Sequence, residues 1–255
     1  MAIFRCTFRS KLLGARVPFN LILPEDCWED VPLVVLLHGL SGNQDDWMVN
    51  CPLDKLMGER KMAALLPDGQ KSWFCDMKYG SPYATYIAEE LIDYVRSIFP
   101  VTKAREKTFA AGLSMAGYGA LKLTLRWPER FAACGALSGA ADIYARFALG
   151  DRHDQGVAIW GEDYLSVIPG SQDDTYHLTR KLETENKPKP WIYQACGLED
   201  KRLGENHMFR DFIRDRGYVY EYYEGPGRHN WDFWNQQIVP VLDFFVRCME
   251  ENGGR

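Results

Sequence analysis

Short runs of apolar residues recur along the whole chain and predict the strands of a sheet. Residues 33–37 are apolar without interruption, which is typical of a strand buried on both faces of a parallel sheet. Two β-rich stretches come before this run and are joined by a turn near Leu13-Gly14. The expected strands cover residues 3–8, 16–23, 33–37, 63–66, 108–111, 132–137, 191–195 and 219–223.

Segments with helical periodicity alternate with these strands. In residues 83–99 the apolar side chains fall at steps of three and four residues, which predicts a helix with one buried face. Residues 234–249 follow the same spacing, and Pro240 among them should bend this helix or mark its early turns. Strands that alternate with helices predict an α/β fold with a mostly parallel sheet covered on both faces. Ligands of such sheets bind beyond the carboxyl ends of the strands.

Residues 141–189 interrupt this alternation. They contain several glycines and acidic residues, together with an isolated Ile159-Trp160 pair. We expect an irregular, lid-like excursion over the edge of the sheet, and this excursion is a candidate roof for an active site. Pro188 and Pro190 should end it before the next strand. Because no repeat or Gly-, Ser- or Pro-rich linker divides the chain, we expect a single domain over residues 1–255.

Composition and charge narrow the class of protein. Of the 255 residues, 46% are hydrophobic and 25% are charged, which is ordinary for a globular chain. The formal net charge of −5 argues against a nucleic-acid partner, because binding to phosphates needs a basic face. The N-terminus lacks a charged region followed by an apolar run, and no apolar run is long enough to cross a bilayer. We therefore expect no signal peptide and no membrane partner.

The seven cysteines are scattered and never occur in a CxxC spacing. They are Cys6, Cys27, Cys51, Cys75, Cys134, Cys196 and Cys248. Buried free thiols in a reducing cytosol explain this pattern, so a cytoplasmic location is expected. A zinc site and a disulfide framework are the alternatives.

A candidate nucleophile lies between a predicted strand and a predicted helix, at Ser114. A nucleophilic serine at such a sharp turn needs small residues two positions before and after it, and Gly112 and Ala116 occupy these positions. The amide dipoles of the following helix would favour the negative charge of acyl transfer. The alternative is a turn that only packs a helix on a strand. Ser138 is a weaker candidate, expected to be a strand-end serine near the site.

Acyl transfer also needs backbone amides that bind the developing oxyanion. The amide of Met115, directly after the candidate nucleophile, is the first expected donor. The glycine-rich loop after the strand at 33–37 suggests the amide of Leu40 as the second, although this segment also fits a plain strand-end loop. We expect His38 to be a structural histidine whose hydrogen bonds shape this loop.

Among the five histidines, His229 is the candidate general base. It follows a late strand, precedes the final helix and lies in a loop whose glycines and proline can place an imidazole. His153 and His177 fall in the excursion, and His207 is expected on a helix.

The orienting acid should follow another late strand, and residues 196–200 fit this position. Glu199 and Asp200 are adjacent there, and both must be considered. A carboxylate at this place gives the chain order serine, acid, histidine, which is the order expected for such a sheet.

These motifs together resemble the esterase D or putative esterase family of α/β-hydrolases, and most closely its small tributyrin esterases. The resemblance covers roughly residues 3–250. It is carried by His38-Gly39, Gly112-Leu113-Ser114-Met115, Ser72-Trp73, Glu199-Asp200 and Gly227-Arg228-His229-Asn230-Trp231.

The resemblance implies a serine carboxylesterase with Ser114, Asp200 and His229 as catalytic residues. Leu40 and Met115 would be the oxyanion donors. Neither a metal nor an organic cofactor is implied, the partner is a small-molecule acyl ester, and a homo-oligomer is expected because such proteins often assemble.

Two positions depart from the family pattern. Ala116 replaces the customary glycine of the turn. Asn230 and Trp231 follow His229 where S-formylglutathione hydrolases tend to carry a second histidine, which disfavours a glutathione thioester as substrate.

The acyl pocket is predicted to be small, which favours acetyl to butyryl groups. Its candidate walls are Trp47, Trp73, Trp160, Trp231 and Trp234, although each of them also fits a place in the core. The alternative activities on this scaffold are an S-formylglutathione hydrolase-like thioesterase, an acetyl-sugar or xylan esterase, a feruloyl esterase and an acyltransferase. A binding module on an inactive hydrolase fold is the non-enzymatic alternative.

Overall fold

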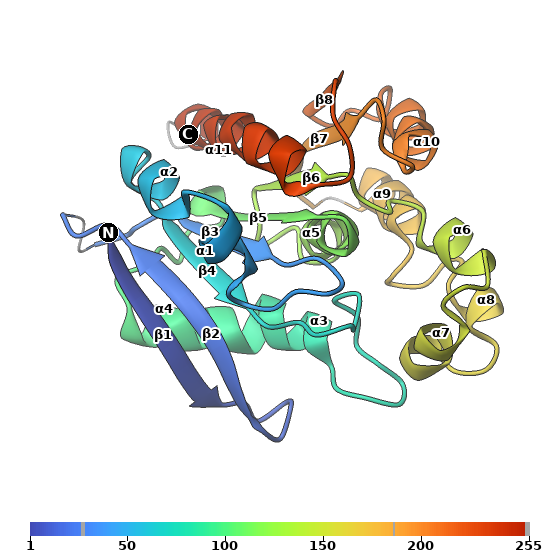
Figure 1. The fold of residues 1–255 in the computed structure, drawn as a ribbon, viewed down its shortest axis with the longest axis horizontal. Coiled ribbons are helices and arrows are strands. Elements are labelled where there is room, and N and C mark those ends of the chain that lie inside the picture. The colour runs from blue at the N-terminus through green and yellow to red at the C-terminus, as the bar shows by residue number, and fades with distance from the viewer. Residues whose placement is uncertain (27–28, 186, 253–255) are drawn as a thin grey trace.

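A computed structural model of the chain describes residues 1–26, 29–185 and 187–252. Within these ranges one eight-stranded sheet has the order β1-β2-β4-β3-β5-β6-β7-β8 (Figure 1). The strands are β1 (Ala2–Arg9), β2 (Arg16–Leu23), β3 (Leu33–Leu37), β4 (Ala63–Pro67), β5 (Thr108–Leu113), β6 (Ala133–Leu137), β7 (Trp191–Gly197) and β8 (Tyr220–Gly225). Each expected strand is present, with ends that differ by at most two residues.

The sheet is mostly parallel, as predicted. β1 pairs with β2, and β2 with β4, in antiparallel fashion, whereas every later neighbouring pair is parallel. In the register of β3, β5 and β6, Leu37 lies opposite Gly112, and Gly112 opposite Ala136. The carboxyl ends of these strands therefore end at one edge of the sheet, where the loops that follow them meet.

Helices cover both faces of the sheet. They are α1 (Asp46–Asn50), α2 (Leu53–Glu59), α3 (Tyr83–Thr85), α4 (Ile92–Ile98), α5 (Met115–Arg126), α6 (Ile143–Ala148), α7 (His153–Trp160), α8 (Tyr164–Val167), α9 (Thr175–Thr184), α10 (Leu203–Ile213) and α11 (Trp231–Asn252). A π-helical segment η1 (Tyr86–Leu91) joins α3 to α4, and a 3-10 turn η2 (Arg105–Lys107) precedes β5. The predicted helix at 83–99 is thus one continuous helical segment with a π-helical middle.

Alternation along the strands builds a core on each face. Val35 of β3 packs in the cluster formed with η1, α4 and α5, whereas Val34 and Leu36 pack in the cluster with α1, α2 and α11. All residues of β3 are buried. A strand covered on both sides must be apolar at every position, which is why an unbroken apolar run identified it.

The expectation for residues 141–189 needs correction. The segment does leave the sheet between β6 and β7, but it is not irregular, because it forms the helices α6 to α9 (Figure 1). Asp142 and Asp174 cap α6 and α9, each accepting a hydrogen bond from the backbone amide three residues on. The helices α6 to α8 are short and bury few residues each, so they leave a weak periodic pattern. In α9 the buried Thr175, Leu178 and Leu182 do follow helical spacing, so this pattern and the capping aspartates were available signals.

The predicted C-terminal helix starts three residues earlier than expected and continues through Pro240. This proline is the tenth residue of α11, beyond its first turns, so it removes one backbone hydrogen bond without ending the helix.

Candidate active site

Ser114 occupies a strained turn between β5 and α5. Its backbone has φ 57° and ψ −117°, a conformation that residues with a side chain rarely adopt. Its amide donates a hydrogen bond to the carbonyl of Leu137 on the neighbouring strand, which holds the turn in place (2.8 Å). The hydroxyl is thereby raised above the edge of the sheet.

The small residues around the turn are required by close packing. A Cβ atom added to Gly112 would lie 2.5 Å from the Cβ of Ala116. Ala116 is fully buried, and its methyl group fits because Gly112 has no side chain. The departure from the family's customary glycine therefore leaves the turn intact.

The structure brings Ser114, His229 and Asp200 into one hydrogen-bonded line. His229 Nε2 lies 2.8 Å from Ser114 Oγ, and His229 Nδ1 lies 2.8 Å from Asp200 Oδ2. A carboxylate only accepts hydrogen bonds, so Nδ1 carries the proton and Nε2 accepts from the serine hydroxyl. In this tautomer the imidazole is ready to take the hydroxyl proton.

The loop that holds His229 is braced by the loop after β7. The amide of Glu199 donates to the carbonyl of Gly227 (3.0 Å), and a Cβ atom at Gly197 would lie only 2.3 Å from that same carbonyl oxygen. Gly227 has φ 150°, in the region that favours glycine. These contacts set the distance between the acid and the histidine.

Of the two adjacent carboxylates, Asp200 points inward and Glu199 outward. The Asp200 side chain is fully buried, whereas Glu199 is exposed and accepts from Arg228 Nε (2.8 Å). Burial alone would raise the pKa of Asp200. Hydrogen bonds from His229, the Arg202 amide and Ser138 outweigh burial and lower this pKa, so the carboxylate stays ionised at neutral pH.

Ser138 is a strand-end serine beside the site, as expected. It follows β6, has a positive φ of 49°, and helps to lower the pKa of Asp200. Its hydroxyl also accepts from Trp234 Nε1 (3.1 Å), and the Trp234 ring meets the His229 ring edge to face at 5.1 Å. Trp234 therefore connects Ser138 with the His229 ring.

The two amides expected to bind an oxyanion flank Ser114. The loop after β3 packs against the end of β5, since a Cβ atom at Gly39 would lie 3.0 Å from Leu113 Cδ1. Leu40 lines the same cavity as Ser114, and Met115 begins α5 directly after it. The role of both amides as donors stays a prediction.

His38 is structural, as predicted. It is buried, its Nδ1 donates to the carbonyl of Gly39 (2.7 Å), and its Nε2 accepts from the amide of Gly69 (2.9 Å). It thereby ties the loop after β3 to the loop after β4. His207 lies on α10, as expected, whereas His153 and His177 lie on α7 and α9 rather than in irregular chain.

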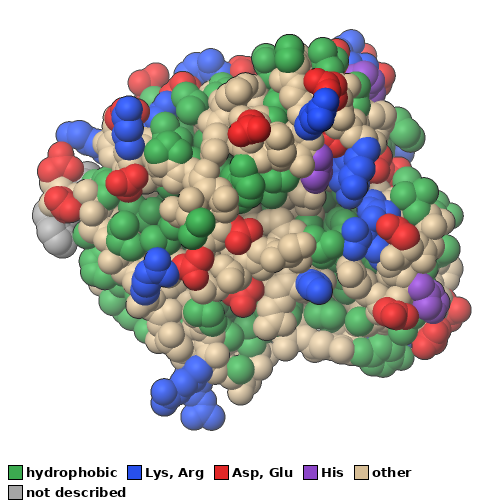
Figure 2. All heavy atoms as spheres, viewed as in Figure 1, with side chains coloured by type: hydrophobic (Ala, Val, Ile, Leu, Met, Phe, Trp, Pro, Cys, Tyr) green, Lys and Arg blue, Asp and Glu red, His purple; other side chains and the backbone are tan. Residues whose placement is uncertain are grey.

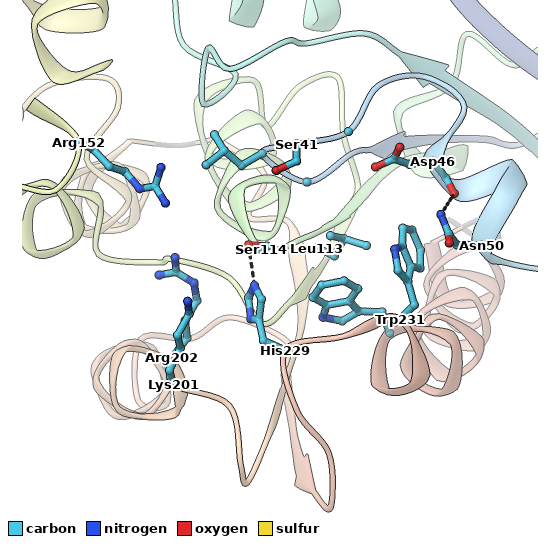
Figure 3. Close-up of a pocket in the computed structure, with 14 residues that line it drawn as sticks. Ser41, Asp46, Asn50, Leu113, Ser114, Arg152, Lys201, Arg202, His229 and Trp231 are labelled. Atoms are coloured by element: carbon cyan, nitrogen blue, oxygen red, sulfur yellow. Dashed lines mark hydrogen bonds between the residues drawn. The ribbon is translucent and has the colours of Figure 1, made fainter. Parts of the chain in front are cut away.

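A cavity of about 410 Å³ opens at the Ser114–His229 pair (Figure 3). Its walls come from the loops after β3, β5, β7 and β8, from the segment before α7, and from the helices α1 and α11. The lining residues are Gly39, Leu40, Ser41, Gly42, Asp46, Asn50, Leu113, Ser114, Arg152, Lys201, Arg202, His229, Trp231 and Trp234.

The predicted tryptophan walls divide into two groups. Trp231 and Trp234 line the cavity and pack edge to face on each other (5.5 Å). Trp47, Trp73 and Trp160 are buried away from the cavity lining, so the structure does not bring them to the proposed pocket. The indole N–H group of each of these three tryptophans donates a hydrogen bond to a protein oxygen, so its polar group is satisfied within the core.

Sequence reasoning missed the charged lining of the cavity, namely Arg152, Lys201, Arg202 and Asp46. Lys201 and Arg202 directly follow the predicted acid, so their position was an available signal. Arg152 lay in the excursion, where nothing local showed that it would reach the site.

Two features are absent from residues 1–26, 29–185 and 187–252. No group of three or more His, Cys, Asp or Glu side chains is placed there to hold a metal ion. No helix there has the length and apolar character needed to cross a bilayer.

The strand order and the serine raised at the end of β5 define the class of protein. Such a sheet, with histidine and carboxylate on the loops after its last two strands, is the α/β-hydrolase fold. The model of the family described as putative esterase matches residues 10–245, and the chain belongs to this family.

Known relatives agree on the class of reaction. An acetyl esterase of Caldicellulosiruptor saccharolyticus is 33% identical, over 98% of this chain and 100% of its own length. A substrate-bound structure of the fluorophosphonate-binding serine hydrolase F of Staphylococcus aureus is 31% identical, with a TM-score of 0.89 over 96% of this chain and 98% of its own.

An S-formylglutathione hydrolase structure from Staphylococcus aureus is also 31% identical, with a TM-score of 0.87 and the same coverage. The protein is a carboxylic ester hydrolase.

Proposed function

We propose that the protein hydrolyses short-chain acyl esters, from acetyl to butyryl, through an acyl-enzyme on Ser114. The observation that carries this proposal is the unbroken hydrogen-bonded line from the Ser114 hydroxyl through His229 to the buried Asp200 carboxylate. Its serine end opens into the cavity.

In the first step, Ser114 Oγ attacks the carbonyl carbon of the ester while His229 Nε2 takes the hydroxyl proton. The carbonyl oxygen becomes an oxyanion, which the amides of Leu40 and Met115 stabilise. When this intermediate collapses, the bond to the alcohol oxygen breaks, and the alcohol leaves with the proton from His229.

In the second step, water attacks the acyl group on Ser114, and His229 again takes and returns one proton. Asp200 keeps Nδ1 protonated and stabilises the imidazolium that forms in both steps. The products are the carboxylic acid and the free serine.

Trp231 and Trp234 form an aromatic wall of the cavity, and the packing of this wall favours a small acyl group as substrate. Trp234 is held by Ser138 on one side and by Trp231 on the other, and Trp231 packs edge to face on the buried Trp47 (5.1 Å). A wall braced in this way has little freedom to make room for a long chain. The acetyl esterase relative supports the same substrate size.

Ser114→Ala tests the nucleophile. We expect loss of 4-nitrophenyl acetate hydrolysis with an unchanged circular dichroism spectrum, because the substitution removes only the attacking oxygen. In the wild type, a fluorophosphonate probe should label the peptide containing residue 114. Retained turnover in the variant would remove Ser114 from the mechanism.

A series of 4-nitrophenyl esters from acetyl to dodecanoyl tests the acyl size. We expect kcat/KM to be highest between acetyl and butyryl and to fall for longer chains. A steady rise with chain length would contradict the small pocket while leaving the esterase assignment in place.

A thioesterase is the second candidate, because an S-formylglutathione hydrolase is among the similar structures. Assays of S-formylglutathione beside an acetylated sugar separate the two, with higher kcat/KM for the acetyl ester expected. We also propose that the partner is a small-molecule ester and that the protein is cytoplasmic. Finally, we propose that the protein self-associates, which light scattering after gel filtration tests.

A further inference from the structure

One side of the cavity carries three cationic side chains. Arg152 precedes α7, whereas Lys201 and Arg202 follow the Asp200 turn, so two distant segments supply them. Figure 3 shows them together on one side of the Ser114–His229 pair, with Trp231 and Asp46 on the other side. Figure 2 shows basic side chains gathered on the part of the surface near α6, α7 and α10. We call Arg152, Lys201 and Arg202 the basic wall.

The basic wall has more positive charge than its neighbours neutralise. Arg202 is 6% exposed, and its Nη1 donates to Glu205 at 3.1–3.2 Å. Its Nε is buried without a hydrogen-bond partner in the described structure. Arg202 is thus a buried side chain with a free donor beside the cavity, a state that ordinarily costs stability.

Arg152 has no ion-pair partner of its own in the described structure. Its Nε is buried without a partner among the described residues, and the face of Trp73 lies 5.7 Å away. The nearby Asp151 is already engaged by Arg146, whose two Nη atoms donate to its two carboxylate oxygens at 2.8 Å.

Lys201 adds an exposed positive charge to the wall. Within the described ranges no carboxylate lies within ion-pair distance of it, and Glu199, two residues earlier, pairs with Arg228 instead. Of the three cations of the wall, only Arg202 is ion-paired, to Glu205. Asp151 also attracts Arg152, but its carboxylate is shared with Arg146.

We propose that the basic wall is a subsite for an anionic group, so that the preferred esters carry a carboxylate or phosphate on one of their two halves. Planar guanidinium groups match a carboxylate or phosphate with two parallel hydrogen bonds. In a half-enclosed cavity these bonds are weakly screened by solvent. The proposal rests on hydrolysis at Ser114, because the wall lines the same cavity.

Two matched ester pairs identify which half carries the anion. For the acyl half, 4-nitrophenyl hydrogen glutarate is compared with 4-nitrophenyl pentanoate. For the alcohol half, 4-acetoxybenzoate is compared with 4-acetoxybenzamide. After subtraction of the uncatalysed rate, we expect kcat/KM to favour the anionic member of one pair by about tenfold or more, the effect of one strong charge-assisted hydrogen bond.

Arg152→Gln should lower kcat/KM for the favoured anionic ester about tenfold more than for its neutral partner. Arg247→Gln is the matched control, since it removes the same charge from the surface of α11, where Arg247 pairs with Glu221. The preference should also weaken as NaCl is raised from 0.05 to 0.5 M, conditions that screen such a contact.

The two proposals can fail separately. Neutral esters hydrolysed without any anionic preference, or a preference unchanged in Arg152→Gln, would overturn the subsite alone. If no ester is hydrolysed, the proposed function fails, and calorimetry still decides the subsite. In that case 4-acetamidobenzoate should bind more tightly than 4-acetamidobenzamide to wild type but not to Arg152→Gln, and equal binding to wild type would overturn the subsite.

Discussion

At the residue scale, the site depends on a serine held in an unfavourable backbone conformation. Such a φ/ψ pair costs about 1–3 kcal/mol and persists only when the surroundings enforce it. Here the amide of Ser114 donates a hydrogen bond to the carbonyl of Leu137, and Gly112 and Ala116 pack closely against each other across the turn. The strain keeps the hydroxyl exposed to the cavity and within reach of His229.

Asp200→Asn tests the orientation of the histidine. An amide at this position can donate to Nδ1, which moves the imidazole proton to Nε2 and leaves no acceptor for the Ser114 hydroxyl. We expect kcat to fall on the order of 10⁴-fold with little loss of stability.

Glu199→Gln is the control for Asp200→Asn, because this adjacent carboxylate is exposed and pairs with Arg228. Its activity should stay within a few-fold of wild type. A larger effect at Glu199 than at Asp200 would exchange their roles.

At the element scale, a buried ion pair joins the excursion to the hydrolase sheet. Lys122 of α5 is fully buried, and its Nζ donates to the carbonyl of Phe74 (2.5 Å), to Cys75 Sγ (3.0 Å) and to Asp173 Oδ1 (3.0 Å). Asp173 lies before α9 and also accepts from Trp160 Nε1 (2.8 Å). This network fixes α7 and α9 against α5, and with them the segment that carries Arg152.

Lys122→Met should destabilise the protein by about 3–5 kcal/mol, because it leaves the buried Asp173 carboxylate without its cation. Urea unfolding followed by tryptophan fluorescence measures the loss. Lys55→Met is the matched control, since Lys55 is 73% exposed and should change stability by less than about 0.5 kcal/mol. Equal effects of the two substitutions would contradict the structural role of the pair.

The stability difference between wild type and Lys122→Met should also depend on pH. Burial would raise the pKa of Asp173, but Lys122 and the Trp160 hydrogen bond lower it below the ordinary aspartate value. A lowered pKa contributes stability above the unfolded value, about pH 4, and this contribution is lost as the pH falls through the folded value.

Without Lys122, burial dominates and the pKa of Asp173 should rise above its unfolded value. As the pH falls, Asp173 should then take up a proton in the folded variant, which removes the cost of its unpaired buried charge. The stability difference between wild type and Lys122→Met should therefore be largest near pH 7 and shrink towards pH 4. A difference that stays constant over this range would show that Asp173 does not carry it.

At the scale of the whole molecule, the site is assembled from the carboxyl ends of neighbouring strands. Leu40 follows β3, Ser114 follows β5, Ser138 follows β6, Asp200 follows β7 and His229 follows β8. These strands are adjacent in the sheet, so residues far apart in sequence arrive at one edge. Cores packed on both faces of the sheet support this edge from behind.

The density of that core predicts how the cysteines react. Cys6, Cys51, Cys75, Cys134, Cys196 and Cys248 are free thiols in the described structure, and Cys27 lies outside the described residues. Burial is the main cause that raises the pKa of Cys51, Cys75, Cys134 and Cys196 to about 12 and that of Cys248 to about 11.

At pH 8 we expect iodoacetamide to leave these five buried thiols unmodified in the native protein and to alkylate them in urea. Peptide mass spectrometry measures each site. Rapid native labelling of Cys75 or Cys134, both fully buried, would contradict the packing of the core.

Local patterns in the sequence determined the strands, the two longest helical segments and the serine turn. The apolar runs do so because a strand buried on both faces tolerates only apolar residues, and the turn does so because Gly112 and Ala116 must be small. From the residues alone, Glu199 and Asp200 were equivalent. The choice of Asp200 came from a family resemblance, and the geometry agrees with it.

Tertiary structure alone decided what faces the cavity. Trp231 and Trp234 line it whereas Trp73 and Trp160 do not, and Arg152 reaches it from the excursion. Such positions depend on strand register and on the packing of segments that are distant in sequence. No local periodicity records these long-range contacts, because each segment is compatible with several partners until the whole chain has packed.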